Sequence, residues 1–443
     1  MRNHHESFLD ALPRGWAFDR LKDVVTLRND KTNEASAEAD YLELEDLESA
    51  TGCVLSRRNT LAVESAVTLF KKGDVLFGKL RPYLEKYYEA EFDGKCTGEI
   101  LAFKPERMAS RFLFYCVASR WFVERCNALA YGAKMPRVSW EKQLSQFYIP
   151  LPPLPEQQRI AAYLDASCVA IDAAVDAKRA QIETLDGVRR EIIQKAVTRG
   201  LEEYPTLKKT GNVWMNELPC TWELVSLKRV SEIQGGLTLG KIYEGPLIER
   251  PYLRVANVQD GHLNLQDVTT IEVPEEVAHR VELRPGDVLM TEGGDLDKLG
   301  RGTIWNGEIP DCLHQNHIFA IRCFRHKLLA DFLAYLTASR YGRDYFEATG
   351  KRTTNLASTN STKVGLFPIP RPSIEEQRAI CRFLDEKLGH VAQIVNGIEA
   401  QIETLIAYRK SLIHECVTGQ RRITEVDLAW VGRGESLSSR PNR

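Results

Sequence analysis

The chain of 443 residues lacks the segments that send a protein into or across a membrane. Its first residues, MRNHHESFLDALPRGW, contain no apolar stretch of the kind found in signal peptides. No apolar run approaches the roughly 20 residues that a transmembrane helix needs. We therefore expect a cytoplasmic protein that makes no membrane contact.

Cysteine occurs ten times but never as a Cys-x-x-Cys pair. Single, scattered cysteines argue against a disulfide framework and against a zinc ribbon. The two histidines of HQNH have no acidic or cysteine ligand at suitable spacing, so no metal is expected there. The cysteines are predicted to be small, buried apolar residues in a reducing compartment.

Catalytic signatures are also missing. The sequence has no H-E-x-x-H, no G-x-S-x-G and no Asn/Asp-Pro-Pro-aromatic tetrapeptide of the adenine methyltransferases. The stretch GGLTLGKI approaches a phosphate-binding loop, but Ile242 stands where a magnesium-binding hydroxyl is needed, and a turn is the better interpretation. The sequence favours binding over catalysis and predicts no cofactor on this chain.

Neither sign of charge dominates. The chain has 59 Lys and Arg against 61 Asp and Glu, a formal net charge of −2. A protein that binds a polyanion unaided usually carries a basic excess. Any contact with nucleic acid is therefore expected to use local basic patches, or to be shared with partner proteins.

The chain contains a long internal repeat. The pentapeptide QIETL occurs at residues 181–185 and again at 401–405, an offset of 220. At this offset no gap is needed over residues 112–198. Nearer the start of each half the offset falls, because LPRGW aligns with LPCTW at 206 and KKGDVLF with RPGDVLM at 213. This pattern is typical of a fixed scaffold that carries a variable head.

The constant part of each half predicts a long helix. Its apolar residues recur in steps of three, four and seven, as in a coiled-coil seam that only Lys178 interrupts. Two such rods, of about 40 residues or roughly 60 Å each, most simply pair with each other. They serve either as a stabilising hairpin or as a spacer. The seam residues are Leu164, Ile171, Val175, Ile182, Leu185 and Ile192, and then Leu384, Val391, Val395, Ile398, Ile402, Leu405 and Leu412.

Each head opens with a strand-like run, AFDRLKDVVTL or WELVSLKRVSEI. A Gly-Asp turn then leads into an apolar strand, and a short helix ends at ASR before a glycine-containing loop. The pattern predicts mixed α/β heads. The predicted domains are a first head over 1–153, a helix over 154–200, a second head over 201–372, a helix over 373–419 and a tail over 420–443.

Basic and amide side chains in the head loops are the candidate contacts to a polyanion. Arginine forks onto guanine or phosphate, and Gln and Asn suit adenine edges. For a single loop, a solvated turn is an equally good interpretation, but matched basic loops in both heads favour contact. The candidates are Lys79, Arg81, Lys86, Lys134 and Arg137 in the first head, and Lys298, Arg301, Gln315, Asn316, Lys351, Arg352, Thr353 and Asn355 in the second.

This duplicated layout resembles the DNA-specificity (S) subunit of Type I restriction–modification systems. The resemblance rests on the paired segments IPLPPLPEQQRIAAYLD and IPRPSIEEQRAICRFLD, each followed by the QIETL helix. KKGDVLFGKLRPYLEK and RPGDVLMTEGGDLDKLGRG, with LHQNHIFAIR, are similar to the target-recognition domains of this family. The resemblance covers nearly the whole chain.

The resemblance implies a non-catalytic, pseudo-twofold protein with two target-recognition domains separated by two long antiparallel coiled-coil helices. Each domain would read one half of an asymmetric, bipartite site in double-stranded DNA. Partners would be two methyltransferase (M) subunits and restriction (R) subunits, which would bring S-adenosylmethionine, ATP and Mg. From the residues alone, a coiled-coil scaffold whose heads bind protein stays open. The tail would be disordered or would pack against the N-terminal segment.

Overall fold

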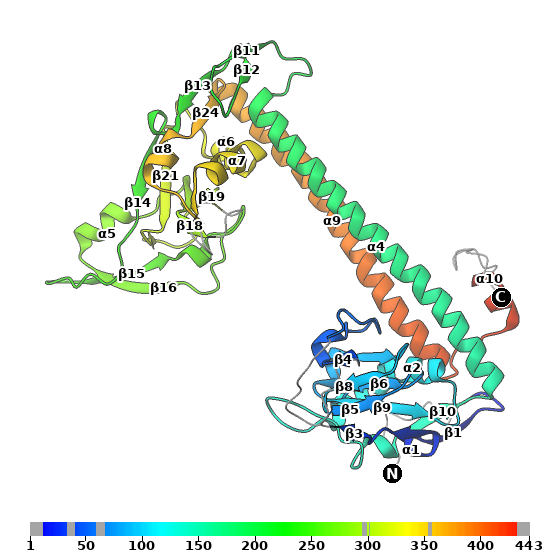
Figure 1. Cartoon of the computed structure of the whole chain (residues 1–443). Helices are drawn as coiled ribbons and strands as arrows, with labels where there is room; N and C mark the ends of the chain where they lie inside the picture. Colours follow the sequence, from blue (N-terminus) through cyan, green and yellow to red (C-terminus); the bar gives the residue numbers. More distant parts are fainter. Residues whose placement is uncertain are drawn as a thin grey trace. The chain divides into compact units, whose positions relative to one another are not determined.

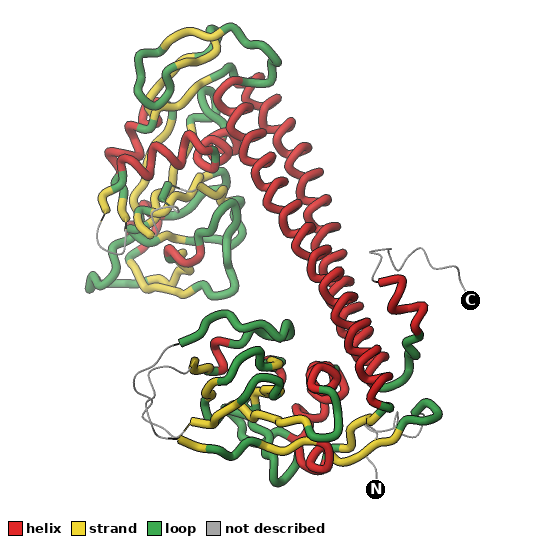
Figure 2. Tube along the Cα trace, turned by 45° about the vertical axis from the view of Figure 1, so that its right-hand side comes forward, coloured by secondary structure: helices red, strands yellow, loops and turns green. Residues whose placement is uncertain are grey.

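A computed structural model describes residues 12–32, 40–58, 67–294, 299–300, 302–352 and 357–431. The chain folds as two compact units. Unit 1 comprises Met1–Arg179 and Glu399–Arg443, and unit 2 comprises Ala180–Ile398. Both units mix helices with short strands, as Figure 2 shows by colour. The predicted mixed α/β class is therefore confirmed.

The described part of unit 1 contains three small sheets. The central sheet has the order β2-β9-β6-β7, and all its neighbouring strands are antiparallel. The second has the order β3-β5-β8-β4, and β1 pairs with β10. The strands are β1 Ala17–Arg20, β2 Val25–Leu27, β3 Lys31–Thr32, β4 Asp40–Leu42, β5 Val67–Phe70, β6 Val75–Gly78, β7 Tyr87–Glu89, β8 Gly94–Cys96, β9 Ile100–Pro105 and β10 Tyr148–Leu151.

Two short helices pack against the central sheet of unit 1. They are α2, Ser110–Ala118, and α3, Arg120–Leu129, and both belong to the core that contains β6. The rings of Phe77 and Phe122 meet edge to face with their centroids 5.2 Å apart. The remaining one-turn helices are α1 Leu21–Val24, η2 Leu44–Asp46, η3 Pro82–Leu84 and η4 Leu144–Gln146.

Unit 2 repeats this arrangement of sheets and helices, which we call the frame. The sheet β14-β21-β17-β19 takes the place of β2-β9-β6-β7, and β13 pairs with β24 as β1 pairs with β10. Strand β15 pairs in parallel with β20 as β4 does with β8. The strands are β11 Leu207–Lys209, β12 Glu217–Pro219, β13 Glu223–Ser226, β14 Ser231–Gly235, β15 Ile248–Leu253, β16 Thr269–Val273, β17 Asp287–Thr291, β18 Gly293–Gly294, β19 Gly302–Trp305, β20 Leu313–His314, β21 Ile318–Cys323, β22 Lys351–Arg352, β23 Ala357–Ser358 and β24 Pro368–Arg371.

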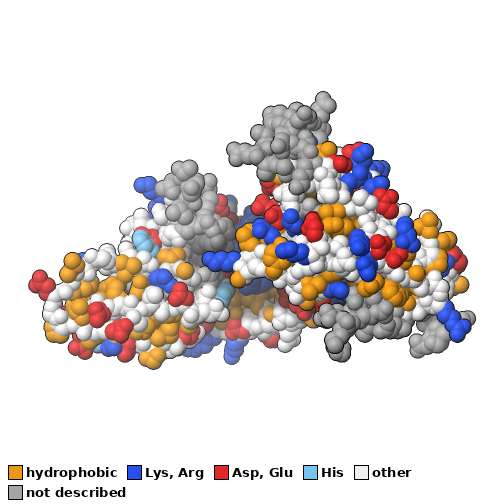
Figure 3. Space-filling model, turned by 90° about the horizontal axis from the view of Figure 1, so that it is seen from below, with side chains coloured by type: hydrophobic (Ala, Val, Ile, Leu, Met, Phe, Trp, Pro, Cys, Tyr) orange, Lys and Arg blue, Asp and Glu red, His pale blue; other side chains and the backbone are white. Residues whose placement is uncertain are grey.

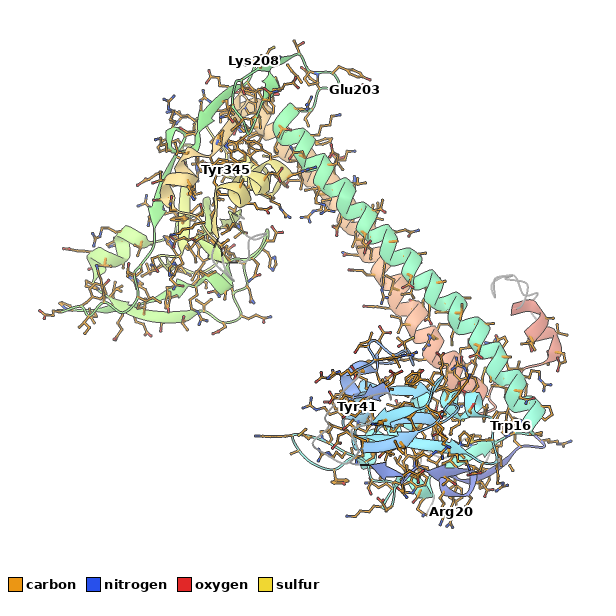
Figure 4. The ribbon with its side chains drawn as sticks, viewed as in Figure 1. Trp16, Arg20, Tyr41, Glu203, Lys208 and Tyr345 are labelled. Atoms are coloured by element: carbon orange, nitrogen blue, oxygen red, sulfur yellow. The ribbon has the colours of Figure 1, made fainter. Side chains whose placement is uncertain are left out.

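The helices of unit 2 match those of unit 1 in the same way. Helices α6 and α7 pack against their sheet, and Tyr345, labelled in Figure 4, lies 4% exposed in that core. The helices are α5 Glu275–Val281, η5 Leu227–Arg229, η6 Val255–Asn257, α6 Ala330–Ala338, α7 Arg340–Thr349 and α8 Ser361–Leu366. The internal repeat of the sequence is thus a repeat of structure.

Two long helices, α4 (Leu154–Arg199) and α9 (Ile374–Val417), pass through both units. In unit 1 the start of α4 lies beside the end of α9, as Figure 1 shows, and Asp172 pairs with Arg409 at 3.2 Å. In unit 2 the end of α4 shares a core with the start of α9. The helices run antiparallel in each unit, and every predicted seam residue is buried or half-buried. The predicted domain limits divide the chain differently from the two units and stay a prediction.

Two local expectations were wrong. The run AFDRLKDVVTL is not one strand, because the one-turn helix α1 separates β1 from β2. Its Leu21 and Val24, three residues apart, are both fully buried on one side of that turn. The ASR motif is followed by a second helix rather than directly by a loop. The hydroxyls of Ser119 and Ser339 cap α3 and α7, accepting from backbone N–H groups three residues on.

The C-terminal segment packs on unit 1. Arg159 of α4 donates to the Ile423 carbonyl at 2.8 Å, and Arg422 pairs with Glu156 at 3.1 Å. Gly419, at φ +75°, lies against Trp16, which Figure 4 labels, just as Gly200, at φ +79°, lies against Trp222 in unit 2. Over residues 420–431, which include α10 (Glu425–Val431), the tail packs on the start of α4, and the expected packing against the N-terminal segment stays a prediction.

We expect Ile423→Ala to lower the free energy of unfolding of unit 1 by about 2–4 kcal/mol, because this side chain is 2% exposed and its loss leaves a cavity. Val426→Ala is the control, since Val426 lies in the same segment, is 66% exposed, and its removal should change stability by less than about 0.5 kcal/mol. Urea unfolding measures both. Equal unfolding midpoints for the two variants would show that the C-terminal segment adds nothing to unit 1.

Candidate nucleic-acid interface

In unit 1, two predicted contact loops lie side by side. The backbone N–H of Arg81 donates to the Pro136 carbonyl at 2.7 Å, and the N–H of Val138 donates to the Lys79 carbonyl at 3.0 Å. The segments KLRPYLEK and GAKMPR, which are separated by 45 residues of the chain, are therefore joined by backbone hydrogen bonds and form one surface strap. Arg81 adopts a left-handed conformation at φ +50°, which turns the chain at this point.

The side chains of this strap differ in how far they are engaged within the protein. The ammonium of Lys86 donates to the Leu47 carbonyl, and the Arg137 guanidinium pairs with Glu99 at 3.2 Å. Arg81 and Lys134 are exposed, Lys79 is half-buried, and these three have no ion-pair partner among the described residues. Their charge is therefore available to an external anion, which makes them the better candidates.

In unit 2, the turn that carries Gln315 and Asn316 is held from three sides. The Gln315 N–H donates to the carbonyl of Leu253 at 2.9 Å, and the Asn316 N–H donates to that of Leu237 at 2.9 Å. The Ile318 N–H closes the turn onto the Gln315 carbonyl at 2.9 Å. Both backbone donors are used up within the protein, while the two amide side chains are only half-buried. The turn presents these amides from a fixed backbone.

Gly236 allows this turn to approach the segment after β14. A Cβ built at Gly236 would lie 2.3 Å from both the His314 and the Gln315 carbonyl oxygens. No real side chain tolerates that distance to backbone atoms. The signal for this close approach in the sequence is the Gly-Gly pair at 235–236, from which a turn is predicted but not the contact with HQNH.

His314 supports the same turn from inside. It is fully buried, its Nδ1 lies 2.9 Å from the Ile318 carbonyl oxygen, and its Nε2 has no hydrogen-bond partner among the described residues. Burial lowers the pKa of His314 to about 4. The imidazole is therefore neutral at pH 7, with its proton on Nδ1, because a carbonyl can only accept. His314 is a core residue rather than a metal ligand.

Glu292 links the glycine-rich loop of unit 2 to HQNH and to the residues that follow GKRTTN. Its N–H donates to the His317 carbonyl at 2.8 Å, its carbonyl accepts from Thr359 at 2.8 Å, and its carboxylate lies 2.7 Å from His317 Nδ1. The next residues form β18, which pairs with β23, and β23 pairs with β22. The glycine-rich loop, HQNH and the GKRTTN segment are thus brought together.

Several predicted contacts fall on residues outside the described part of the chain. Lys298, Arg301, Thr353 and Asn355 lie outside the described residues, and of Arg352 only the backbone is described, in β22. Lys351 is exposed at the start of that strand. All thirteen candidate contacts stay predictions.

The structure also describes the weaker motifs. GGLTLGKI contains a turn at residues 239–240 and no helix opens after it, which supports the turn interpretation. Among the described residues there is no cluster of three or more metal-ligating side chains, and no helix is both long and apolar enough to cross a membrane. The ten cysteines are free, and Cys53 and Cys220 are exposed.

In both heads, the buried aspartate of the Gly-Asp turn forms an ion pair with an arginine. Asp74 and Asp287 are each at most 2% exposed and accept from the backbone of their own turn at 2.8 Å. Arg28, just after β2, forks onto Asp74, whereas Arg322, within β21, forks onto Asp287. The two heads keep the carboxylate and supply its counter-charge from different strands. This repeated motif is structural.

Charge is local rather than global. On the face drawn in Figure 3, Lys and Arg are interspersed with Asp and Glu among apolar side chains. This agrees with the net charge of −2. Nucleic-acid binding by this chain therefore has to rest on particular loops.

Comparison with known proteins gives a consistent result. Residues 13–184 match the family model of the Type I restriction modification DNA specificity domain. The chain is 22% identical over 458 residues to the Type I restriction enzyme EcoKI specificity subunit of Escherichia coli K12, covering 97% of this chain and 93% of the relative. It is 26% identical over 206 residues to the putative MjaX specificity subunit of Methanocaldococcus jannaschii, about 46% of this chain and 47% of the relative.

The fold is shared as well. A chain solved in work on complex assembly and conformational transition of the type I R-M system superposes with a TM-score of 0.71 at 21% identity. The match covers 93% of this chain and 99% of the other. The family model matches one part of the chain, the relatives match nearly end to end at low identity, and the fold is shared, so the chain is similar to the DNA specificity subunits of Type I restriction–modification systems.

Proposed function

We propose that this chain reads an asymmetric, bipartite site in double-stranded DNA, with one half-site contacted by each unit. The observation that carries the proposal is one frame with two different sets of polar loops. The sheets and helices of unit 1 recur in unit 2, while KLRPYLEK and GAKMPR give way to the glycine-rich loop, HQNH and GKRTTN. Two readers with the same fold and different loop chemistry suit two unlike half-sites.

The chain itself would carry no catalytic step. It would dock two methyltransferase subunits, which would bind S-adenosylmethionine, and restriction subunits, which would use ATP and Mg. The net charge of −2 supports DNA binding by the whole complex, because partner subunits that also contact phosphates would supply part of the positive charge.

The direct test is selection from a random duplex library by the full chain with its methyltransferase partner. We expect enrichment of a split motif, with two short specified segments separated by unspecified bases. If the wild-type complex enriches no such motif, the proposal is wrong.

A protein-binding scaffold is the alternative, and one variant separates the two functions. Lys79, Arg81, Lys351 and Arg352 are replaced together by alanine. DNA reading predicts a weaker complex and a salt dependence reduced by up to about four counterions. The scaffold predicts unchanged DNA affinity. Replacing Lys86 and Arg137 instead is the control, because both already have partners within the protein.

A further inference from the structure

Unit 2 contains an arginine-lined recess of about 620 Å3 at one end of its central sheet. Arg284 precedes β17, Arg322 and Arg325 lie at and after the end of β21, and Arg378 lies on the first turns of α9. Two aspartates also line it, so the four arginines leave a net charge of +2. The apolar lining comes from Pro285, Ile304, Leu329 and Ala330.

Three of these arginines form no ion pair among the described residues, and Asp331 is the one carboxylate of the lining that is left to offset their charge. Arg322 is occupied by Asp287, but Arg284, Arg325 and Arg378 are exposed and have no ion-pair partner among the described residues. A Cβ built at Gly286 would lie 3.7 Å from Nη2 of Arg325, so this guanidinium lies over the glycine turn. Several like charges around one recess repel each other, and a bound anion removes that repulsion.

The equivalent place in unit 1 is neutralised by the chain itself. The register of β21 on β17 and that of β9 on β6 place Arg107 of unit 1 at the position that Arg325 has in unit 2. The Arg107 guanidinium forms an ion pair with Asp19 at 2.7 Å. The helix offset of 220 matches Asp331 with Arg111, which pairs with Asp165 and Glu89. The same offset places Gln158 where unit 2 has Arg378. One frame therefore carries an open cationic recess in unit 2 and a closed ion-pair network in unit 1.

The recess lies away from the loops that are candidates for DNA contact. Strand β17 begins at the recess and ends at the glycine-rich loop, and β21 begins after HQNH and ends at the recess. Five residues of strand separate the two ends by about 17 Å. A duplex held by the loops is therefore poorly placed to fill the recess with its own phosphates.

We propose that this recess binds a free phosphate-bearing anion with two or more negative charges, such as a pyrophosphate or nucleoside polyphosphate group, and that unit 1 has no such site. Guanidinium groups bind phosphate oxygens in a bidentate manner, and the net charge of +2 calls for a multiply charged ligand. The lining contains no aromatic side chain, so the site offers no platform for a base and would hold the phosphates. The inference does not depend on sequence-specific DNA reading.

Calorimetric titration of the full chain with inorganic pyrophosphate, in magnesium-free buffer at fixed ionic strength, tests the proposal. We expect one saturable site per chain. The double variant Arg325→Ala with Arg378→Ala should weaken binding at least tenfold. The matched double variant of unit 1, Arg107→Ala with Gln158→Ala, should change affinity by less than twofold.

Competition identifies the ligand. ATP is expected to displace pyrophosphate, whereas hexaglutamate and a short random duplex are not. Displacement by hexaglutamate or by the duplex would overturn the assignment in favour of an acidic protein segment or a DNA contact. Absence of saturable binding, or equal weakening by the two double variants, would also overturn it. If the unit 2 double variant melts early by circular dichroism, Arg325→Ala and Arg378→Ala are titrated singly, each with an expected loss of at least threefold.

Discussion

Replacement of Gly236 by alanine is expected to abolish recognition of one half-site and leave the other intact. The new methyl group would lie 2.3 Å from two backbone carbonyl oxygens, so the turn that carries Gln315 and Asn316 has to move. Each correctly placed amide contributes about 1–3 kcal/mol of base discrimination. We therefore expect affinity for the cognate site to fall on the order of 100-fold, measured by gel shift with the methyltransferase partner present.

The neighbouring glycine is the control. A Cβ built at Gly235 meets nothing within 4 Å, so Gly235→Ala should bind within about twofold of wild type. Wild-type binding by Gly236→Ala would show that the turn does not position base contacts. Loss of both half-sites would show instead that the substitution unfolds more than this turn.

The second large effect is a dependence of stability on pH. His314 has a pKa of about 4 in the folded protein because burial disfavours its charged form, against 6.5 when it is exposed. Between these values the unfolded chain binds more protons, so the stability of unit 2 should fall as pH drops from about 6.5 to 4 and be fully present above 6.5. The free energy of unfolding of unit 2 should therefore be about 3 kcal/mol higher above pH 6.5 than below pH 4.

Urea unfolding of unit 2 between pH 4 and 7 measures this dependence, and His314→Gln should flatten the part of it that this histidine contributes. Ile242→Ala is the control in the same unit, because this side chain carries no ionisable group, is 96% exposed and should leave the pH dependence in place. An unchanged profile for His314→Gln would contradict the assignment of a buried, neutral histidine behind the turn.

The repeat, the long helices and the mixed α/β heads were predictable because they rest on periodicity and on a fixed offset. The seam residues from Leu164 to Leu412 are buried or half-buried as expected. The one-turn helix at Leu21–Val24 was not predicted, because apolar and polar residues alternate over the eleven residues of AFDRLKDVVTL as they do in a strand. The helix shows only in the structure, where Leu21 and Val24 are both buried in one core. The second helix after ASR was missed because its capping serine was interpreted as the end of an element.

The candidate site was predictable as a set of loops but not as an arrangement. Sequence spacing does not reveal that Arg81 bonds to Pro136, or that Glu292 ties HQNH to Thr359. It also does not distinguish Lys86, which is engaged with Leu47, from Arg81, which is not. Such contacts are made between residues far apart in the chain, so they follow from tertiary packing alone.

The most direct test of the central claim is library selection by three complexes: the wild type, Arg81→Ala with Lys134→Ala in unit 1, and Gln315→Ala with Asn316→Ala in unit 2. We expect each double variant to lose base preference in one half-site, a different half for each, while the other half and the unspecified bases between them stay as in the wild type. Loss of preference in both halves by either variant, or in the same half by both, would contradict the central claim.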